Sequence, residues 1–555
     1  MRLRYQDIKG FICLNAEVIM NSNRIDLDIL IIGAGFAGMY MLYRMKKLNL
    51  KVLAIESASD VGGTWYWNRY PGARCDVESV EYSYSFSEEL QQDWQWTHRF
   101  SDQPEILKYA NHVADRFDLR PDIKFDTKVI SANYNSESKL WEVVTDKRDL
   151  YFSRFCIMAT GTLSAPNDPD FDGLDDFEGE WYMTSKWPHQ SPDFTGKRVG
   201  IIGTGSTGIQ TIPVVAEEAK HLTVFQRTAQ FTIPANNRKL NFDEVEEVKR
   251  NYSEIRKKAR ESRGGIAFMN IGDKSALEVS DQERYEKFSS IWNGPGLNDF
   301  VASYNDIVTN IEANELAGDF LKSKIREIVE DDQIAEKLIP EILFWCKRVC
   351  ADTNYYETYN KENVELVDVS SSPIDKILPE GIEVSNKVYD LDVIIFAIGF
   401  DALTGALNAI DIVGKDGVKL KEKWADGPIT YLGLAVNGFP NLFTITGPGS
   451  PSVLSNMMTS IEQHVDWVSN FIEYSFDKGL KEIEASNTAE IEWTSHVEEL
   501  GENSLKSNSG CNSWYLGSNV PGKKRVFMPY IGGVGKYREE CDAIVSTGYR
   551  GFLLN

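Results

Sequence analysis

The sequence predicts an α/β protein with two parallel-sheet domains and a helical insertion, and three observations lead to this fold class. Two short apolar runs each end in a glycine-rich segment followed by a helical pattern, at residues 27–47 and 198–218. A charged stretch between residues 237 and 344 has helical spacing and no glycine motif. A chain of 555 residues with 42% hydrophobic content is long enough for two or more domains.

Composition argues against several classes of partner. Acidic residues number 83 against 59 basic residues, and a net charge of −24 would repel nucleic acid. The longest nearly apolar run, residues 29–43, is shorter than the roughly 18 residues that a membrane-spanning helix needs. No obligatory protein partner is evident. The seven cysteines include no CxxC pair, so we interpret them as mostly core residues of a cytoplasmic protein.

The start of the chain is expected to be an extension that precedes the first domain. Residues 1–25 have a basic beginning and an apolar middle, but Asn15 and Glu17 interrupt that middle. No small-residue cleavage site follows, so the segment does not resemble a signal peptide.

The first glycine motif has the form of a dinucleotide-binding turn. The apolar run of residues 27–32 leads into Gly33, Gly35 and Gly38, and a helical pattern follows. A second apolar run ends at Glu56, where a Rossmann-like fold needs an acceptor for ribose hydroxyls. This arrangement predicts a site for a dinucleotide with free ribose hydroxyls, as in FAD or NAD.

The second glycine motif repeats this pattern without the acid. RVGIIGTGSTGIQ contains Gly203, Gly205 and Gly208, and the next apolar run ends at Gln226, followed by Arg227 and Thr228. A guanidinium can pair with a 2′-phosphate that a carboxylate would repel, so this site is expected to hold NADP. The alternative for Arg227 is an ordinary solvated surface arginine.

Three further glycine-terminated strand patterns, at residues 155–161, 392–401 and 441–451, are expected to close the sheets. The predicted organisation is therefore two Rossmann-like domains, each discontinuous. We expect an N-terminal extension at 1–25, an FAD-binding domain at 26–165 and 393–555, an NADP-binding domain at 166–236 and 345–392, and a helical insertion at 237–344.

Two dinucleotides in one chain suggest electron flow from NADPH to a flavin. A disulfide reductase would need a CxxC pair, which the chain lacks. The six histidines are scattered without metal-ligand spacing, so no metal site is expected. Molecular oxygen is then the natural electron acceptor.

The stretch GGTWYWNRYPGARCD, residues 62–76, links the sequence to a known family. It fits the pattern [AG]GxWxxxx[FY]P[GM]xxxD, and with VESVEYSYSF it resembles the segment after the FAD-binding unit of Baeyer–Villiger monooxygenases. The resemblance runs from about Asp26 to the C-terminus and is strongest to the phenylacetone and cyclohexanone types. It also covers WCKRVCADTNYYETYN and GPGSPSVLSNMM.

The resemblance implies conversion of ketones to esters or lactones, and also sulfoxidation. In that family NADPH reduces the flavin, oxygen adds to give a C4a-peroxide, and the peroxide attacks the ketone carbonyl. By resemblance Arg348 stabilises the negative charge, Asp76 holds Arg348, and Lys347 faces the NADP phosphate. Without the motif, Lys347 and Arg348 would be interpreted as a solvated pair.

The same resemblance assigns the cofactor-binding residues. The aromatic residues of segment 62–76 would shield the flavin from water, although some of them could simply be core packing. The flavin site is expected to comprise Gly33, Gly35, Gly38, Glu56, Thr64, Trp65, Tyr66, Trp67, Asp76, Tyr82 and Val129. The NADP site is expected to comprise Arg74, Gly203, Thr204, Gly205, Ser206, Thr207, Gly208, Ile209, Gln210, Arg227, Thr228, Lys347, Arg348 and Trp514. Met457 is expected on the substrate side.

One position departs from the family pattern FxGxxxHxxxW[PD]. Phe177, Gly179 and Trp187 match, but Met183 replaces the histidine, and His189 lies six residues further on. The departure is expected to affect coupling between the two domains rather than oxygen chemistry. Two other functions stay open: a flavin-dependent N- or S-oxygenase of soft nucleophiles, and a non-catalytic NADP-binding redox sensor.

Overall fold

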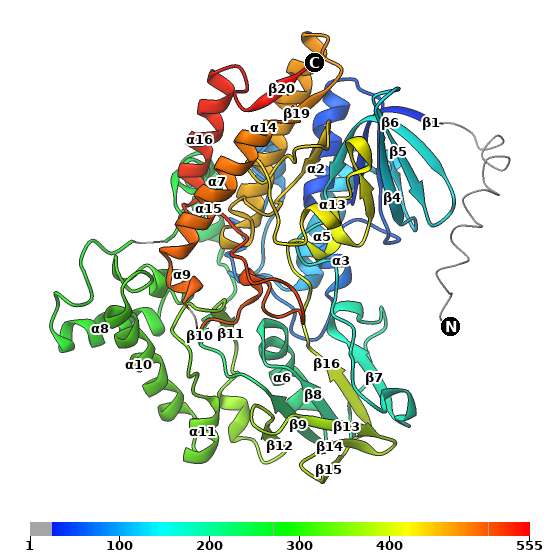
Figure 1. Ribbon diagram of the computed structural model, residues 1–555. Coiled ribbons are helices and arrows are strands. Elements are labelled where there is room, and N and C mark those ends of the chain that lie inside the picture. Colours follow the sequence, from blue (N-terminus) through cyan, green and yellow to red (C-terminus); the bar gives the residue numbers. More distant parts are fainter. Residues whose placement is uncertain (1–24, 270, 509) are drawn as a thin grey trace.

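The computed structural model describes residues 25–269, 271–508 and 510–555. Two sheets, placed one above the other in Figure 1, form the framework, and most helices of the insertion lie beside the lower one. Almost all of the expected N-terminal extension lies outside the described residues, since strand β1 begins at Ile25. In the described part of the chain no helix is both long enough and apolar enough to cross a membrane.

The first sheet has eight strands in the order β17-β4-β5-β6-β1-β2-β3, with β18 paired to β6. Strands β1, β2, β6 and β18 are parallel, as expected for a dinucleotide-binding unit, and helix α2 (Phe36–Lys47) connects β1 to β2. The strands are β1 (Ile25–Ile32), β2 (Val52–Ile55), β3 (Ile123–Lys124), β4 (Val129–Asn135), β5 (Leu140–Thr145), β6 (Leu150–Met158), β17 (Asp411–Val413) and β18 (Leu442–Thr444).

The second sheet has five parallel strands in the order β12-β9-β8-β16-β7. They are β7 (Glu180–Met183), β8 (Arg198–Ile202), β9 (His221–Gln226), β12 (Val364–Asp368) and β16 (Val393–Phe396), and helix α6 (Ser206–Glu218) follows β8. The predicted return from the NADP-binding domain to the FAD-binding domain at residue 393 comes one strand too early. Strand β16 pairs with β8 and β7, so residues 393–396 belong to the second sheet and not to the first.

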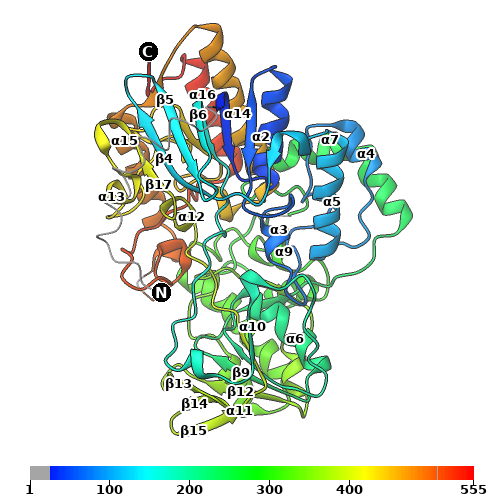
Figure 2. The same cartoon turned by 90° about the vertical axis from the view of Figure 1, so that its right-hand side faces the viewer.

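The helical insertion forms its own aromatic core around Phe288, Phe300 and Phe320. Its helices are α7 (Phe242–Glu261), α8 (Asp281–Trp292), α9 (Leu297–Val301), α10 (Ile311–Ile328) and α11 (Asp332–Leu338). Strand β10 (Thr232–Pro234) enters the insertion and pairs with β11 (Cys350–Asp352), which leaves it. In Figure 1, α7 lies apart from α8, α10 and α11, and Figure 2 shows α7 above α10 and α11, beside the first domain.

The C-terminal part of the chain returns to the first sheet. Helix α14 (Met457–Asp477) packs beside α2, where Asp466 accepts a hydrogen bond from Tyr40 at 2.7 Å. The other helices are α3 (Thr64–Trp67), α4 (Glu88–Asp93), α5 (Gln103–Arg116), α12 (Gly405–Asn408), α13 (Leu420–Lys423), α15 (Asn487–Glu502) and α16 (Val534–Ser546). The remaining strands are β13 (Ile374–Leu378), β14 (Gly381–Val384), β15 (Lys387–Asp390), β19 (Ile483–Ala485) and β20 (Phe552–Leu554).

The cysteines in the described residues are buried, as predicted, but two of them are not free thiols. Cys346 and Cys511 form a disulfide, which the sequence analysis did not anticipate because the two lie 165 positions apart. The free cysteines of the described chain, Cys75, Cys156, Cys350 and Cys541, are all buried. A cytoplasmic location stays a prediction.

Candidate active site

The first glycine turn, residues 33–38, is shaped by close backbone contacts. Gly33 has a φ of +106°, and a Cβ there would lie 2.5 Å from the carbonyl oxygen of Ala159. A Cβ on Gly38 would lie 1.9 Å from the carbonyl oxygen of Gly33, so the helix can approach the strand only with glycine. Gly35 caps α2 without a side-chain acceptor. The first N–H groups of α2 therefore suit the pyrophosphate of a dinucleotide.

Glu56 lies beside this turn, where the sequence predicted it. Its Oε2 accepts a hydrogen bond from the backbone N–H of Ala34 at 2.7 Å, and Oε1 accepts one from Ala58 at 2.8 Å. The carboxylate is thus fixed at the end of β2, and Val129 packs in the same apolar cluster as Ile55. This position suits the ribose end of a bound dinucleotide.

The second glycine turn, residues 203–208, has nearly the same geometry. Gly203 has a φ of +109°, and a Cβ on Gly208 would lie 2.1 Å from the carbonyl oxygen of Gly203. A Cβ on Gly205 would meet no atom within 4 Å, so this glycine faces open space in front of α6. The hydroxyl of Thr204 donates to the carbonyl oxygen of Thr228 at 3.0 Å, which ties the turn to the segment after β9.

Two positive side chains meet beyond the second turn. Burial and, to a smaller extent, the charge of Arg227 together lower the pKa of Lys347 to about 8. Neither residue forms an ion pair with a carboxylate in the part of the chain that the structure describes. A half-buried lysine beside an arginine with no acidic partner is an environment that favours a phosphate.

The aromatic loop, residues 62–76, connects the two glycine turns. At its start, a Cβ on Gly35 would lie 3.3 Å from the Cα of Gly63. At its far end, the hydroxyl of Tyr70 donates to Oε1 of Gln210 at 2.9 Å, and Nε2 of Gln210 donates to the carbonyl oxygen of Arg74 at 3.0 Å. The loop therefore holds both domains in a defined relation.

The rings at the start of the aromatic loop differ in burial. Nε1 of Trp65 donates to the hydroxyl of Tyr82 at 3.1 Å, and the hydroxyls of Tyr66 and Ser59 lie 2.7 Å apart. Trp65 and Tyr66 are buried, whereas Trp67 is 39% exposed. Aromatic packing and a lining role for a cofactor are both compatible with this arrangement.

Arg348 and Asp76 meet although 272 positions separate them. Nε and Nη2 of Arg348 donate to Oδ2 of Asp76 at 2.9 and 2.6 Å, and Nη1 donates to the carbonyl oxygen of Val453 at 3.1 Å. The charge of Asp76 raises the pKa of Arg348 above its ordinary value, against the opposing effect of burial. The result is a guanidinium that is permanently charged and held from two sides.

Two residues predicted near the substrate and NADP pack against the apolar cluster that contains Val453, whose carbonyl oxygen accepts from Arg348. Met457 begins α14 three residues after Leu454 and packs partly buried against the apolar cluster that contains Val453. Trp514 belongs to the same cluster, and its ring centroid lies 4.2 Å from that of Tyr515.

Met183 ends strand β7, packs inside an apolar cluster and is 5% exposed. His189 makes a contact between domains. Its Nε2 lies 3.3 Å from the hydroxyl of Tyr66, and its Nδ1 lies 2.8 Å from Nη1 of Arg69. The sequence analysis saw only that His189 is out of register with the family histidine, since the path of segment 184–189 has no local signal.

Lys506 was also missed. It is fully buried, and its Nζ donates to the carbonyl oxygen of Trp345, three residues before Arg348. A lone lysine in a polar segment gives no sign in the sequence that it will be buried.

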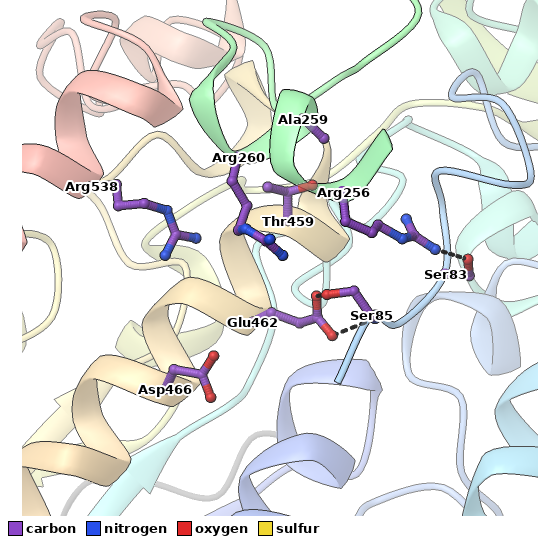
Figure 3. Close-up of a pocket in the computed structure, with 9 residues that line it drawn as sticks. All are labelled: Ser83, Ser85, Arg256, Ala259, Arg260, Thr459, Glu462, Asp466 and Arg538. Carbon is purple, nitrogen blue, oxygen red and sulfur yellow. Dashed lines mark hydrogen bonds between the residues drawn. The ribbon is translucent and has the colours of Figure 1, made fainter. Parts of the chain in front are cut away.

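A separate polar cavity of about 50 Å³ lies between α7, α14 and α16 (Figure 3). It contains none of the predicted site residues. Arg260 and Arg538 line it without a hydrogen bond to another described residue, and the carboxylates of Glu462 and Asp466 lie opposite. Three arginines and two carboxylates line it, and its size is suited to a few water molecules.

Two glycine turns, a connecting aromatic loop and a fixed guanidinium define an oxidoreductase that handles two dinucleotides. In agreement, the family model described as pyridine nucleotide-disulphide oxidoreductase matches residues 30–264. The chain is 42% identical to a Baeyer–Villiger monooxygenase from Pseudooceanicola batsensis, over 95% of this chain and 96% of that protein. It is 39% identical to a phenazine N-monooxygenase from Lysobacter antibioticus, over 97% and 98%. The chain therefore belongs to the Baeyer–Villiger monooxygenase family.

Solved structures agree with this assignment. An oxidized steroid monooxygenase bound to NADP has a TM-score of 0.91 at 50% identity and covers 95% of this chain and 99% of that chain. A complex of OTEMO with FAD and NADP has a TM-score of 0.91 at 41% identity, with the same coverage. The cofactors are FAD and NADP, and both glycine turns fit a bound pyrophosphate.

Proposed function

We propose that this protein oxidises a ketone to an ester or lactone, consuming one NADPH, one proton and one molecule of oxygen and releasing NADP⁺ and water. The observation that carries the proposal is the pair of Arg348 and Asp76, placed where the aromatic loop, the second domain and Val453 meet. We include sulfide oxidation as a second activity of the same site.

The first glycine turn, Glu56 and the aromatic loop would hold FAD, whose redox chemistry would link NADPH to oxygen. The residues of the chain bind and orient the reactants. Arg227, Thr228 and Lys347 would hold the 2′-phosphate of NADPH, and the N-terminus of α6 its pyrophosphate. The buried rings of Trp65, Tyr66 and Tyr82 would exclude water from the reacting groups.

Arg348 would act on the substrate. Addition of oxygen to a ketone carbonyl develops negative charge on the carbonyl oxygen, and a charged donor that is already in place lowers the energy of that state. Asp76 is the positioning group, since it accepts from Nε and Nη2 while the Val453 carbonyl accepts from Nη1. One N–H on Nη1 and one on Nη2 stay available for the reacting oxygen. Met457 and Trp514 would line the substrate and nicotinamide side.

Oxygenation of nitrogen is the second candidate, because a phenazine N-monooxygenase is similar to this chain over nearly its whole length. Soft nucleophiles take up oxygen without developing charge on a carbonyl oxygen, so they depend less on a guanidinium. We therefore expect Arg348→Ala to retain FAD, to lose ester formation by about 100-fold or more, and to keep much of its sulfide oxidation.

The test compares the wild type with Arg348→Ala on a panel of cyclic, aromatic and linear ketones, sulfides and amines, with products identified by mass. Ketone oxidation that depends on Arg348 supports the proposal. Oxidation of amines or sulfides alone by the wild type would favour the second candidate.

A further inference from the structure

The C-terminal loop, defined here as the described residues 503–508 and 510–516, places a lysine against the turn that carries the catalytic arginine. Lys506 has no exposed surface, and its Nζ donates to the carbonyl oxygen of Trp345 at 2.7 Å. The same Nζ lies 4.1 Å from the ring centroid of Trp345 and 4.5 Å from that of Tyr515. No carboxylate in the described residues forms an ion pair with Lys506. The amine is therefore held by one carbonyl oxygen and two aromatic faces.

Burying a charged amine without a counterion is unfavourable, so its hydrogen bond and ring contacts must offset this cost. Burial lowers the pKa of Lys506 well below its ordinary value, and the nearby charge of Arg348 lowers it further. Since an amine donates hydrogen bonds whether it is charged or neutral, the bond to Trp345 does not depend on that charge.

Trp345, whose carbonyl oxygen accepts the hydrogen bond from Lys506, has an unusual backbone conformation. Trp345 has a φ of +67°, a left-handed conformation that bulky residues rarely adopt. We call residues 345–348 the arginine turn. Lys347 leaves this turn toward Arg227, and Arg348 leaves it toward Asp76. A shift of the Trp345 carbonyl would move both side chains.

The C-terminal loop contacts the arginine turn at two further points. The disulfide joins Cys346 of the turn to Cys511 of the loop. Burial raises the pKa of Tyr515 to about 12, and the charge of Arg348 beside it opposes that shift. Trp514, the neighbour of Tyr515, is the residue expected at NADP. The loop and the turn are thus joined by three links. The disulfide cannot be removed without changing a cysteine, and Tyr515 lies beside Arg348 itself. The hydrogen bond of Lys506 is therefore the link that a single apolar substitution can remove with the least direct effect on Arg348.

We propose that Lys506 is a positioning residue, which fixes the arginine turn through the Trp345 carbonyl and so sets the placement of Lys347 and Arg348. The inference rests on the proposed function, because it matters for catalysis only if Arg348 acts on the substrate. A displacement of about 1 Å at such a group can cost up to about 100-fold in rate.

The experiment uses holoenzyme with FAD and compares Lys506→Met, which removes the donor, with Lys506→Gln, which keeps an uncharged donor. Lys423→Met is the matched control. Lys423 is only 14% exposed and forms an ion pair with the buried Glu490, and neither residue forms an ion pair with Arg348. Each protein is assayed with and without dithiothreitol, because the disulfide joins the same two segments. The readouts are amide hydrogen exchange of residues 344–350, the dissociation constant of NADP⁺, the melting temperature, and ester formed per NADPH consumed.

We expect Lys506→Met to speed exchange in residues 344–350, weaken NADP⁺ binding severalfold, and lower ester formation about tenfold or more, with Lys506→Gln recovering much of each loss. Lys423→Met should lower the melting temperature and leave the ester yield per NADPH unchanged. Wild-type exchange and ester yield in Lys506→Met, or equal loss of ester yield in Lys423→Met, would overturn the inference. If Lys506→Met does not fold, the test rests on Lys506→Gln. A Lys506→Gln protein that forms less ester per NADPH while its amide exchange in residues 344–350 is unchanged would also overturn the inference. Absence of ketone oxidation in the wild type would instead refute the proposed function.

Discussion

Replacing Asp76 by asparagine removes the negative charge that holds Arg348 and changes the shape of the side chain little. Oδ2 of Asp76 accepts two hydrogen bonds from Arg348, at 2.9 and 2.6 Å, and the two side chains are only 23% and 33% exposed. A hydrogen bond to a charged partner contributes about 1.5–3 kcal/mol, so the asparagine variant loses roughly 2 kcal/mol of the interaction that positions the guanidinium.

The loss should appear in oxygen transfer and not in flavin reduction. A misplaced catalytic group costs up to about 100-fold in rate, and we expect ester formation by Asp76→Asn to fall about 30-fold to 100-fold. FAD content and the rate of flavin reduction by NADPH should stay within about threefold of the wild type. Stopped-flow absorbance measures reduction, and gas chromatography measures the ester.

Glu78→Gln is the matched control. Oε1 of Glu78 accepts hydrogen bonds from Nε and Nη2 of Arg99 at 2.9 and 2.7 Å, the same geometry two residues further along the chain. This variant should retain its ester yield per NADPH. The reasoning is refuted if Asp76→Asn forms ester within about threefold of the wild type, or if Glu78→Gln loses as much ester formation as Asp76→Asn.

Three further predictions concern coenzyme choice and pH. Arg227→Ala should reduce the preference for NADPH over NADH by about tenfold to 100-fold through a higher KM for NADPH, and an unchanged preference would contradict the assignment. Because the pKa of Lys347 is about 8, its positive charge is lost as the pH rises above 8, so KM for NADPH should increase there while KM for NADH does not. Burial raises the pKa of Glu482, but hydrogen bonds from Lys139, Lys415 and Tyr134 outweigh it and lower that pKa to about 2. The ionised Glu482 therefore contributes fully to stability above about pH 5, and this contribution is lost as the pH falls toward 2. Glu482→Gln should lower the free energy of unfolding at pH 7 by about 2–3 kcal/mol and make that free energy depend less on pH below 5. Urea unfolding at several pH values measures both effects.

The local units of the fold were predictable, because apolar periodicity and glycine spacing act within about 30 residues of one another. Both glycine turns, with the strands before them and the helices after them, lie where the motifs placed them. Strand β16 was predicted in the wrong sheet, because a buried apolar run is compatible with either sheet. Its pairing with β8, which assigns it to the second sheet, has no signal in the local sequence. The pairing of Asp76 with Arg348 could be expected only from the family motif.

The features that were missed depend on contacts between distant segments. Nothing near Lys506 in the sequence indicates that Trp345 will adopt a left-handed conformation and present its carbonyl oxygen to a buried amine. The disulfide between Cys346 and Cys511 joins the same two segments and has no CxxC signal. The contact of His189 with Tyr66 likewise follows from the path of one loop past another.

The central claim is that this chain inserts one atom of molecular oxygen beside a ketone carbonyl, with Arg348 as the essential guanidinium. The most direct measurement supplies purified holoenzyme with NADPH, a ketone and isotopically labelled oxygen gas, and determines the mass of the product and the NADPH consumed. We predict an ester or lactone that carries one labelled oxygen atom, formed with one NADPH per product by the wild type and not by Arg348→Ala. A wild type that consumes NADPH and yields only hydrogen peroxide across a broad ketone panel, or a product without the label, would contradict the account.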